Sequence, residues 1–456
     1  MISIGDLTAS SGQKISGNVP IHVPEDRSTG IYTCSTCSNA TIESNIPITI
    51  VNGILDGPTV LVLSGIHGSE YIPIIATQRL AKDLDPSALQ GSVILVHIAN
   101  LPAYLGRTVY TSPADGKNLN RVFPGNPNGT LSERIANFLV QDVYPVANYV
   151  LDMHSGDANE QLGPSYTAYY GKAGSPEVIQ ASKSIAIAFG LDLMVEFQWE
   201  LLGNNNNNNN NTSKAIWAGS AAVVRGIPSI DVEIAPGMGT SHSDSIDQAY
   251  KGVMRVMVYL GMLPRKAITI TIPDTSTRTV SGIDKDNVEE HKNHKPCLVK
   301  ERHFIEAPLK GSWVPLVDTG TFVARGTSLG YMTDFYGRRK IFEAPAPSNG
   351  LLLIRYESPP VLEGDTLAVI AVLNASDPAC ERLKRDGLLD KHEHEHALSN
   401  NLVLWQWAAA TGWLVALGLG LGTFIGKRRR RKSGSYQHAH VSIGEEGTMD
   451  MDARVV

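Results

Sequence analysis

Residues 60–73 read VLVLSGIHGSEYIP and join an apolar segment to a glycine-rich turn that carries polar side chains. Val60–Leu63 are apolar and include β-branched residues, which predicts an interior strand. Gly65 and Gly68 then mark a tight turn around His67 and Glu70. If this turn opens a helix, an imidazole and a carboxylate three residues apart converge on one point. That spacing is typical of metal ligands.

Length and composition narrow the class of protein. The chain has 456 residues, which is enough for two or three domains. Apolar residues make up 42% and charged residues 18%, which is ordinary for a globular enzyme. The net charge is −6 and no basic patch lies in the body of the chain, so no nucleic-acid partner is expected. Four cysteines do not make a disulfide framework in a chain of this length, and Cys34 and Cys37 lack a second pair that would complete a zinc knuckle.

Downstream of the turn, apolar strands alternate with helical segments. This alternation predicts an α/β/α sandwich with a mixed, mostly parallel sheet over residues 45–265, after an N-terminal segment of residues 1–44. The loops at the carboxyl ends of such strands are where sites form. The expected strands are 60–64, 92–98, 148–153 and 229–233, and the expected helices are 70–83, 131–147, 175–190 and 242–262.

The rest of the chain changes several times in amino-acid composition and in predicted secondary structure. Asn204–Asn211 is a polar low-complexity run and is expected to be a surface insertion. Residues 266–300 are a polar linker, and residues 301–373 predict an all-β domain that resembles a barrel-sandwich. Residues 374–401 form a charged linker that contains His392, His394 and His396, and residues 427–456 form a basic and then polar tail.

Residues 402–426 are 25 residues without a charge, and KRRRRK follows at 427–432. Their length and flanks predict a single transmembrane helix and hence a single-pass membrane protein. The basic cluster is expected on the cytoplasmic side, but no signal peptide precedes residues 1–400, so the side that bears the catalytic domain stays open. Gly418, Gly422 and Gly426 form either a helix-dimer face, which would give a homodimer, or the ordinary glycine content of a membrane helix.

The third metal ligand is expected at the end of another strand. YVLDMHSG, residues 149–156, places His154 there, and a hydrolytic zinc site needs three protein ligands and one open position. Taken alone, His154 is best interpreted as a structural histidine. Taken together with His67 and Glu70, it is best interpreted as a metal ligand. Asp152 is a candidate to orient a neighbouring imidazole.

Other segments offer groups for catalysis and substrate binding. PSIDVEIAPGMG places Glu233 at the end of an apolar strand, where a carboxylate is costly unless it is functional or paired. Glu233 is therefore the candidate general base, and Asp231 is expected to point to the opposite face. Asn120 and Arg121, in DGKNLNRVFPG, suit a substrate carboxylate. Arg107 is either a group that faces a developing oxyanion or part of a surface ion pair.

These motifs carry a family resemblance. GIHGSEY, DGKNLNRVFPG, DMHSG and DVEIAPG follow one another at fitting spacings, and together they resemble the succinylglutamate desuccinylase/aspartoacylase family of the zinc carboxypeptidase-like superfamily. The resemblance covers about residues 45–265 and extends to the all-β stretch. It implies one zinc ion per chain held by His67, Glu70 and His154. It also implies Glu233 as the general base and Asn120–Arg121 as the carboxylate-binding pair.

The hypothesis that follows is a zinc-dependent deacylase acting on small N-acylated amino acids or related amines. Three alternatives remain open: a metallocarboxypeptidase with the same site, an ester hydrolase, and a non-catalytic membrane-anchored binding protein that retains the pocket.

Overall fold

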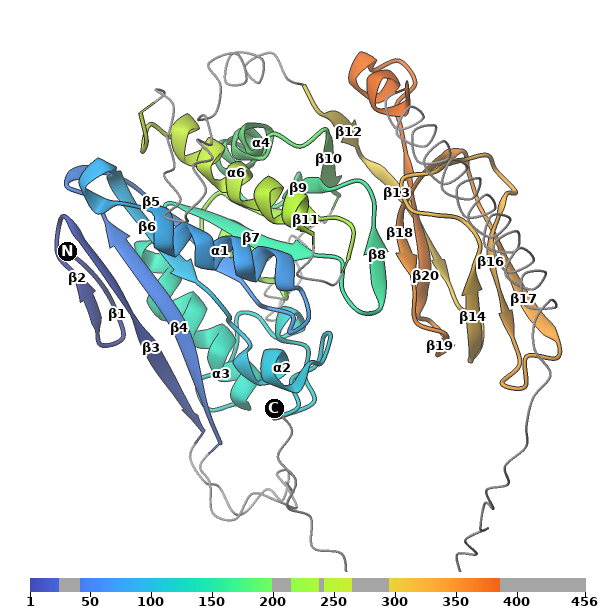
Figure 1. The fold of residues 1–456 in the computed structure, drawn as a ribbon, viewed down its shortest axis with the longest axis horizontal. Helices are drawn as coiled ribbons and strands as arrows, with labels where there is room; N and C mark the ends of the chain where they lie inside the picture. The colour runs from blue at the N-terminus through green and yellow to red at the C-terminus, as the bar shows by residue number, and fades with distance from the viewer. Residues whose placement is uncertain (24–41, 199–214, 238–241, 265–294, 386–456) are drawn as a thin grey trace, which may run out of the picture. The chain divides into compact units, whose positions relative to one another are not determined.

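The computed structural model describes residues 1–23, 42–198, 215–237, 242–264 and 295–385 (Figure 1). They belong to one unit, Met1–Leu389. Several predictions concern residues outside these ranges: the Asn run at 204–211, the Cys34–Cys37 pair, most of the linker at 266–300, and everything from residue 386 onward.

A nine-stranded mixed sheet organises the larger part of the described chain (Figure 1). Its strands are β3 (Gln13–Val23), β4 (Ile42–Asn52), β5 (Leu55–Ser64), β6 (Gln90–Val96), β7 (Tyr149–Ser155), β9 (Tyr166–Tyr170), β10 (Leu193–Phe197), β11 (Ser229–Ile234) and β12 (Cys297–Val299). They lie in the order β12-β10-β9-β11-β7-β5-β6-β4-β3. The central pairs β11–β7, β7–β5 and β5–β6 are parallel, so the carboxyl ends of these strands meet at one edge.

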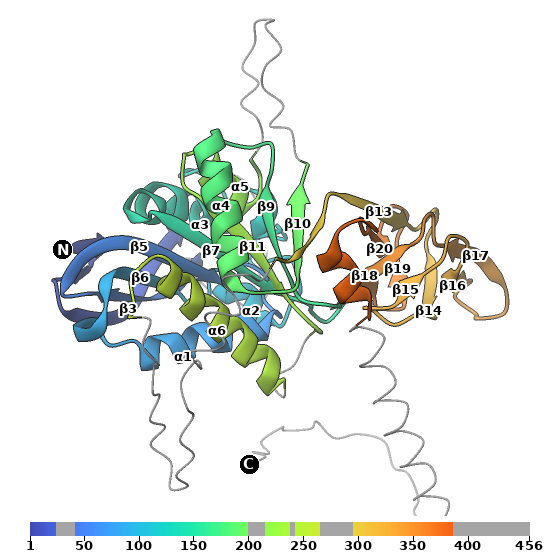
Figure 2. The same ribbon diagram turned by 90° about the horizontal axis from the view of Figure 1, so that it is seen from above.

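Helices cover both faces of this sheet (Figure 2). Along β5, Leu61 and Leu63 face one core and Val60 and Val62 face the other, because side chains alternate along a strand. The first core includes helices α3 (Leu131–Phe138) and α5 (Ala218–Val223), and the second includes α1 (Tyr71–Asp83), α4 (Pro176–Phe189) and α6 (Ser243–Tyr259). Short α2 (Leu101–Gly106) follows β6. The predicted mixed α/β architecture is confirmed.

The described residues after β12 form two further sheets. Their strands are β13 (Glu301–Glu306), β14 (Gly311–Pro315), β15 (Phe322–Val323), β16 (Ser328–Thr333), β17 (Lys340–Pro345), β18 (Gly350–Tyr356), β19 (Pro360–Val361) and β20 (Thr366–Val372). One sheet runs β13-β20-β18-β15 and the other β17-β16-β14-β19, with Trp313 buried between them. Strand β8 (Glu160–Leu162) comes from the α/β part yet pairs with β18. The two parts are therefore joined next to the carboxyl end of β7.

Two segments join the main sheet although the sequence does not assign them to it. Strand β3 lies in the N-terminal segment and pairs with β4 along its whole length, while β1 (Ile2–Ile4) and β2 (Leu7–Ala9) form a small hairpin. Strand β12 lies in the expected linker and extends the other edge by pairing with β10. Both β3 and β12 pair with strands that are distant in sequence, and local sequence patterns do not reveal such pairing.

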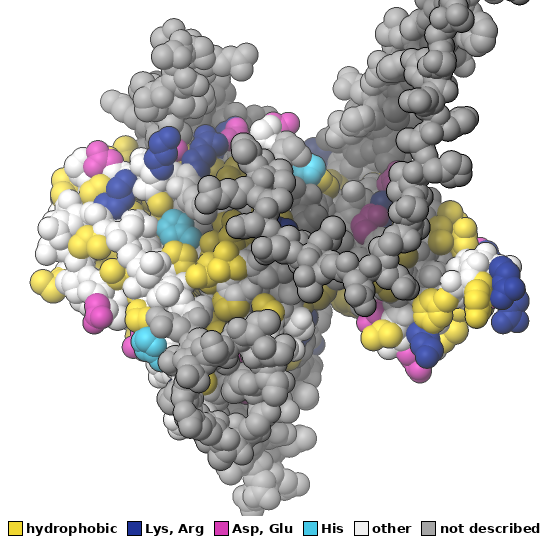
Figure 3. All heavy atoms as spheres, turned by 60° about the horizontal axis from the view of Figure 1, so that its bottom comes forward, with side chains coloured by type: hydrophobic (Ala, Val, Ile, Leu, Met, Phe, Trp, Pro, Cys, Tyr) yellow, Lys and Arg dark blue, Asp and Glu magenta, His cyan; other side chains and the backbone are white. Residues whose placement is uncertain are grey.

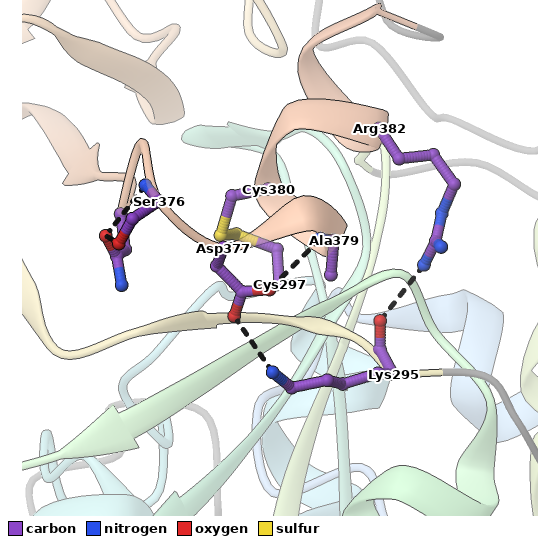
Figure 4. Close-up of a disulfide and its surroundings, with 8 residues drawn as sticks. Lys295, Cys297, Ser376, Asp377, Ala379, Cys380 and Arg382 are labelled. Carbon is purple, nitrogen blue, oxygen red and sulfur yellow. Dashed lines mark hydrogen bonds and ion pairs between the residues drawn. A yellow bond between two sulfur atoms is a disulfide. The ribbon is translucent and has the colours of Figure 1, made fainter.

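One disulfide ties the start of the all-β part to its end (Figure 4). Cys297 in β12 is bonded to Cys380, in a helical segment after β20, and both are buried. The bond closes a loop with a sequence separation of 83 residues, which contains all strands from β13 to β20. Lys295 and Asp377 lie 3.5 Å apart beside it. The sequence analysis does not anticipate this bond.

The prediction of a transmembrane helix, and with it a single-pass membrane location, requires correction. Among the described residues, none of the helices combines the length and the apolar character needed to cross a bilayer. Residues 402–426, and the glycines proposed as a dimer face, lie outside the described part of the chain. The fold is accordingly described without a membrane segment.

One face of the described surface carries charges of both signs. In Figure 3, Lys and Arg side chains are interspersed with Asp and Glu, hydrophobic and uncharged side chains over the coloured part of this face. The view shows no broad field of a single charge on that part.

Candidate active site

The turn after β5 positions the first two candidate ligands. Gly65 has a φ of 69°, and a Cβ at this position would lie 2.8 Å from Cα of Ile98, so the chain requires glycine there. Helix α1 begins at Tyr71, so Glu70 lies directly before its first turn. This local geometry places His67 and Glu70 at the carboxyl end of β5.

His154 at the end of β7 meets this pair. Nδ1 of His67 lies 2.6 Å from Oε1 of Glu70, and Nδ1 of His154 lies 2.8 Å from Oε2 of the same carboxylate. Ligand atoms of the three residues lie within 4.8 Å of one another, and all three side chains are buried. These three residues could hold one metal ion between them.

The outer faces of the two imidazoles indicate which ring nitrogen is available to a metal. Nε2 of His67 lies 3.3 Å from Oδ1 of Asn118, and Nε2 of His154 lies 3.3 Å from Oδ1 of Asp152. Each oxygen favours a proton on Nε2 and leaves Nδ1 with a lone pair. Two imidazole nitrogens and one carboxylate are a donor set that zinc accepts, with a fourth position for water or substrate. The residues therefore fit a zinc ion.

The charges of these groups are strongly coupled. Burial alone raises the pKa of Glu70, but His154 and His67 outweigh it and hold the pKa at about 2. Burial lowers the pKa of His154, but Glu70 and Asp152 outweigh this effect and raise it well above its usual value. Without a metal, protonated histidine therefore balances the carboxylate charge.

Glu233 lies beside the three ligands. It is the register partner of His154 across the parallel β11–β7 pair, and it lines the same cavity. Burial and the charge of Glu70 raise its pKa well above the usual range of a glutamate. A carboxylate with a raised pKa at such a place has the properties of a general base.

The expected orientation of Asp231 is wrong. Asp231 lines the cavity together with Glu233, since residues two apart on a strand share a face. The hydroxyl of Tyr170 donates a 2.7 Å hydrogen bond to Oδ2 of Asp231. Burial and the charge of Asp152, its register partner on β7, raise the pKa of Asp231 to about 7.

Asn120 and Arg121 also line the cavity. Oδ1 of Asn120 accepts a hydrogen bond from the backbone N–H of Ala218 at 2.8 Å, and its amide nitrogen lies 3.4 Å from Nε2 of His154. The guanidinium of Arg121 donates to the backbone oxygen of Asn120 at 2.9 Å and lies 5.7 Å from the ring centre of Trp217. Arg121 stays solvent-exposed because the cavity is open, which leaves donors for a substrate anion.

Arg107 does not join this group. It ends α2 in the left-handed conformation, with a φ of 54°, and its side chain is exposed. It is not among the residues that line the cavity. The expected role toward an oxyanion therefore has no support in its position.

The cavity has a volume of about 630 Å³ and contains residues that sequence patterns do not single out. Tyr110 precedes the Asn120–Arg121 loop, and its ring meets that of His67 edge-on at 5.2 Å. Asp157 and Glu160 follow β7, and Arg302 reaches the cavity from β13 of the all-β part. The only local signal is that Asp157 and Glu160 follow DMHSG closely. No local signal marks Arg302, because the fold brings it in from a distant segment.

Comparison with known proteins agrees with this geometry. Residues 56–260 match the family model described as the succinylglutamate desuccinylase/aspartoacylase catalytic domain. The predicted resemblance to this family is thus confirmed for residues 56–260. It is 28% identical over 333 residues to N-alpha-acetyl-L-2,4-diaminobutyric acid deacetylase of Halomonas elongata, an alignment that covers 72% of this chain and 85% of that protein. This relative is a deacetylase, which supports an enzymatic role for this chain.

Solved structures show the same fold. A succinylglutamate desuccinylase/aspartoacylase from Rhodobacter sphaeroides matches with a TM-score of 0.60 and 24% identity, over 79% of this chain and 96% of that chain. The product-bound ectoine utilization protein EutE (DoeB) from Ruegeria pomeroyi matches with a TM-score of 0.60 and 24% identity, over 80% and 97%. These alignments extend beyond residues 56–260, so the likeness is not confined to the catalytic domain.

Proposed function

We propose that the protein is a zinc-dependent deacylase that hydrolyses the amide bond of small N-acyl amino acids. The observation that carries the proposal is the convergence of His67, Glu70 and His154 with Glu233 in one cavity. Three ligands with an open fourth position, next to a carboxylate, are the arrangement that metal-assisted hydrolysis requires. The deacetylase relative supports an N-acyl amino acid as the substrate class.

His67 and His154, through Nδ1, and Glu70 would hold the metal. Zinc bound there supplies a Lewis acid for the acyl carbonyl and lowers the pKa of the attacking water. Asp152 lies beside the outer ring nitrogen of His154, and Asn118 lies beside that of His67, so the two side chains keep both imidazoles oriented for binding.

In the proposed reaction, Glu233 transfers a proton from the attacking water to the departing nitrogen. As a carboxylate it accepts a proton from the attacking water, and as a carboxylic acid it returns that proton to the departing nitrogen.

Arg121 binds the substrate carboxylate in this proposal. Arg121 lines the cavity and is exposed, and Asn120 fixes the loop by accepting from the backbone N–H of Ala218. A carboxylate held by Arg121 would orient the amide toward the ligand cluster. Arg107 has no part in the proposal.

Removal and return of the metal test the function. Purified protein is assayed on N-acetyl amino acids before chelation, after chelation with dipicolinate, and after zinc is restored. The proposal predicts loss of hydrolysis with chelation and recovery with zinc. Faster hydrolysis of short peptides or esters would favour the metallocarboxypeptidase or the ester hydrolase. Bound zinc without turnover of any of these substrates would favour a binding protein.

A further inference from the structure

The cavity is larger than a small N-acyl amino acid requires. Its volume is about 630 Å³, and cavities of about 300–1,000 Å³ hold drug-sized ligands. In the proposed function, the metal ligands and Glu233 serve the reacting amide, and Arg121 serves the carboxylate. The rest of the lining is therefore free to select a further group of the substrate.

Aromatic side chains from three distant segments line this cavity. They are Phe197 at the end of β10, Trp217 directly before α5, and Phe304 in β13 of the all-β part. The ring centres of Phe197 and Trp217 lie 6.3 Å apart, which is within the range of about 4.5–7 Å that favourable aromatic pairs adopt. We call these three side chains the aromatic wall.

Arg302 connects the ring from the all-β part to the ring at the end of β10. Cζ of its guanidinium lies 4.6 Å from the ring centre of Phe197 and 5.4 Å from that of Phe304. Planar guanidinium groups pack well on aromatic faces. Burial lowers the pKa of Arg302, and the nearby phenol of Tyr166 and carboxylate of Glu233 offset part of that shift. Because Glu233 acts on this guanidinium, the aromatic wall lies next to the reaction centre.

The other end of the aromatic wall lies beside the proposed carboxylate-binding residue. Cζ of Arg121 lies 5.7 Å from the ring centre of Trp217. A substrate whose carboxylate is held by Arg121 therefore has its remaining atoms close to the rings. Since Arg121 and Arg302 pack on Trp217 and Phe197, a third planar group would meet both rings and guanidinium faces there.

Phe304 leaves apolar surface available to a ligand. Its side chain is 53% exposed, whereas Ile305, next to it on β13, is buried in the core of the all-β part. Leu162 and Ile354, register partners on β8 and β18, add apolar surface to the same cavity. Excluding water from such a surface is favourable, so the lining suits a bulky apolar group.

We propose that the aromatic wall binds an aromatic ring of the substrate. The preferred substrates are then N-acyl amino acids that carry a phenyl or similar ring on the acyl group or on the side chain. Either position brings the ring close to the wall, because both groups are attached directly beside the reacting amide. The inference rests on the proposed function for the positions of the amide and the carboxylate.

Three substrates with a single carboxylate test the proposal. They are N-acetylalanine, N-acetylphenylalanine with the ring on the side chain, and N-(phenylacetyl)alanine with the ring on the acyl group. For the zinc-loaded wild type, at least one ring-bearing substrate should exceed N-acetylalanine in kcat/KM by about tenfold to a hundredfold, as expected for burial of a phenyl ring against other rings. The substrate with the larger advantage identifies the position of the ring. No advantage for either one would overturn the inference and leave the proposed function standing.

Two variants assign the effect to the aromatic wall. Phe304→Ala removes a ring that is more than half exposed, and Phe197→Leu keeps an apolar side chain but removes the aromatic face. Each should lower the ratio of kcat/KM for the preferred ring-bearing substrate to that for N-acetylalanine, by about threefold to tenfold. Phe335→Ala, at a 67% exposed ring between β16 and β17 that does not line the cavity, is the matched control and should keep the ratio. An unchanged ratio in both wall variants would overturn the assignment.

Binding separates this inference from the proposed function. Calorimetry compares phenylalanine with alanine, and phenylacetate with acetate, on the zinc-loaded wild type and Phe304→Ala, without any turnover. Tighter binding of a ring-bearing ligand that is weakened in Phe304→Ala supports the aromatic wall even if no amide is hydrolysed. The absence of that preference in both pairs refutes it even if amides are hydrolysed.

Discussion

Replacing Asp152 by Asn removes a buried negative charge 3.3 Å from Nε2 of His154 and keeps the size of the side chain. Asp152 holds His154 in the tautomer that leaves Nδ1 for the metal. It also lies beside Asp231, its register partner, and neither of its carboxylate oxygens makes a hydrogen bond of good geometry within the described residues. The substitution should therefore weaken metal binding.

The magnitude follows from these contacts. Loss of a group that orients a metal-binding histidine lowers metal affinity by about 10- to 100-fold. At about 1.4 kcal/mol for each factor of ten, this is about 1.4–2.8 kcal/mol of binding free energy. The stabilisation that a fixed, saturating concentration of zinc gives to the folded chain should fall by the same amount. In the metal-free chain, the lost repulsion between Asp152 and Asp231 and the lost attraction between Asp152 and protonated His154 oppose each other, so its free energy of unfolding should change less than that of the zinc-bound chain.

Two measurements on Asp152→Asn test its effects on zinc affinity and on the free energy of unfolding. Competition with a chromophoric chelator gives the zinc affinity, and urea denaturation with and without zinc gives the free energy of unfolding. Asp142→Asn, at an exposed carboxylate, is the control and should match the wild type in both. Zinc affinity within about twofold of wild type in Asp152→Asn would refute the orienting role.

Three further predictions concern stability and substrate binding. Cys380→Ser opens the loop that encloses the all-β part, and should lower the free energy of unfolding by about 2–4 kcal/mol in urea denaturation; an unchanged midpoint would contradict a structural role. The melting temperature of the metal-free chain should fall between about pH 5.5 and about pH 8. Asp157, Glu160 and Asp231 have folded-state pKa values raised to about 6, 7 and 7, so the folded chain binds more protons than the unfolded chain in this range and loses stability as they dissociate. Bound zinc should reduce this fall, and a melting temperature that rises with pH would contradict the assignment. Arg121→Lys should lower kcat/KM for N-acyl amino acids about tenfold or more but not for N-acyl amines without a carboxylate, and equal losses on both would argue against carboxylate binding.

The parts of the site that follow strand ends could be predicted from the sequence. His67, His154 and Glu233 each follow or end an apolar run, and those runs are the neighbouring strands β5, β7 and β11. Parallel neighbours bring their carboxyl ends to one edge, so three local patterns imply one cluster. The alternation of strands and helices gave the α/β architecture for the same reason.

The remaining parts depend on contacts between distant segments. Arg302 lies in the sheet that contains β13, and Glu160 is held by the pairing of β8 with β18, so no local pattern places either residue at the cavity. Arg107 sits close in sequence to a site residue, but a left-handed helix end turns it outward. The prediction that Asp231 points away from Glu233 is wrong because side chains two residues apart on a strand lie on the same face.

Parallel measurement of bound zinc and hydrolysis in Glu233→Gln tests the central claim most directly. The substitution keeps the shape of the side chain and removes the base while leaving His67, Glu70 and His154 intact. We expect one zinc ion per chain, as in the wild type, with kcat on an N-acyl amino acid lowered by about a hundredfold or more. Wild-type turnover in zinc-loaded Glu233→Gln would contradict the account.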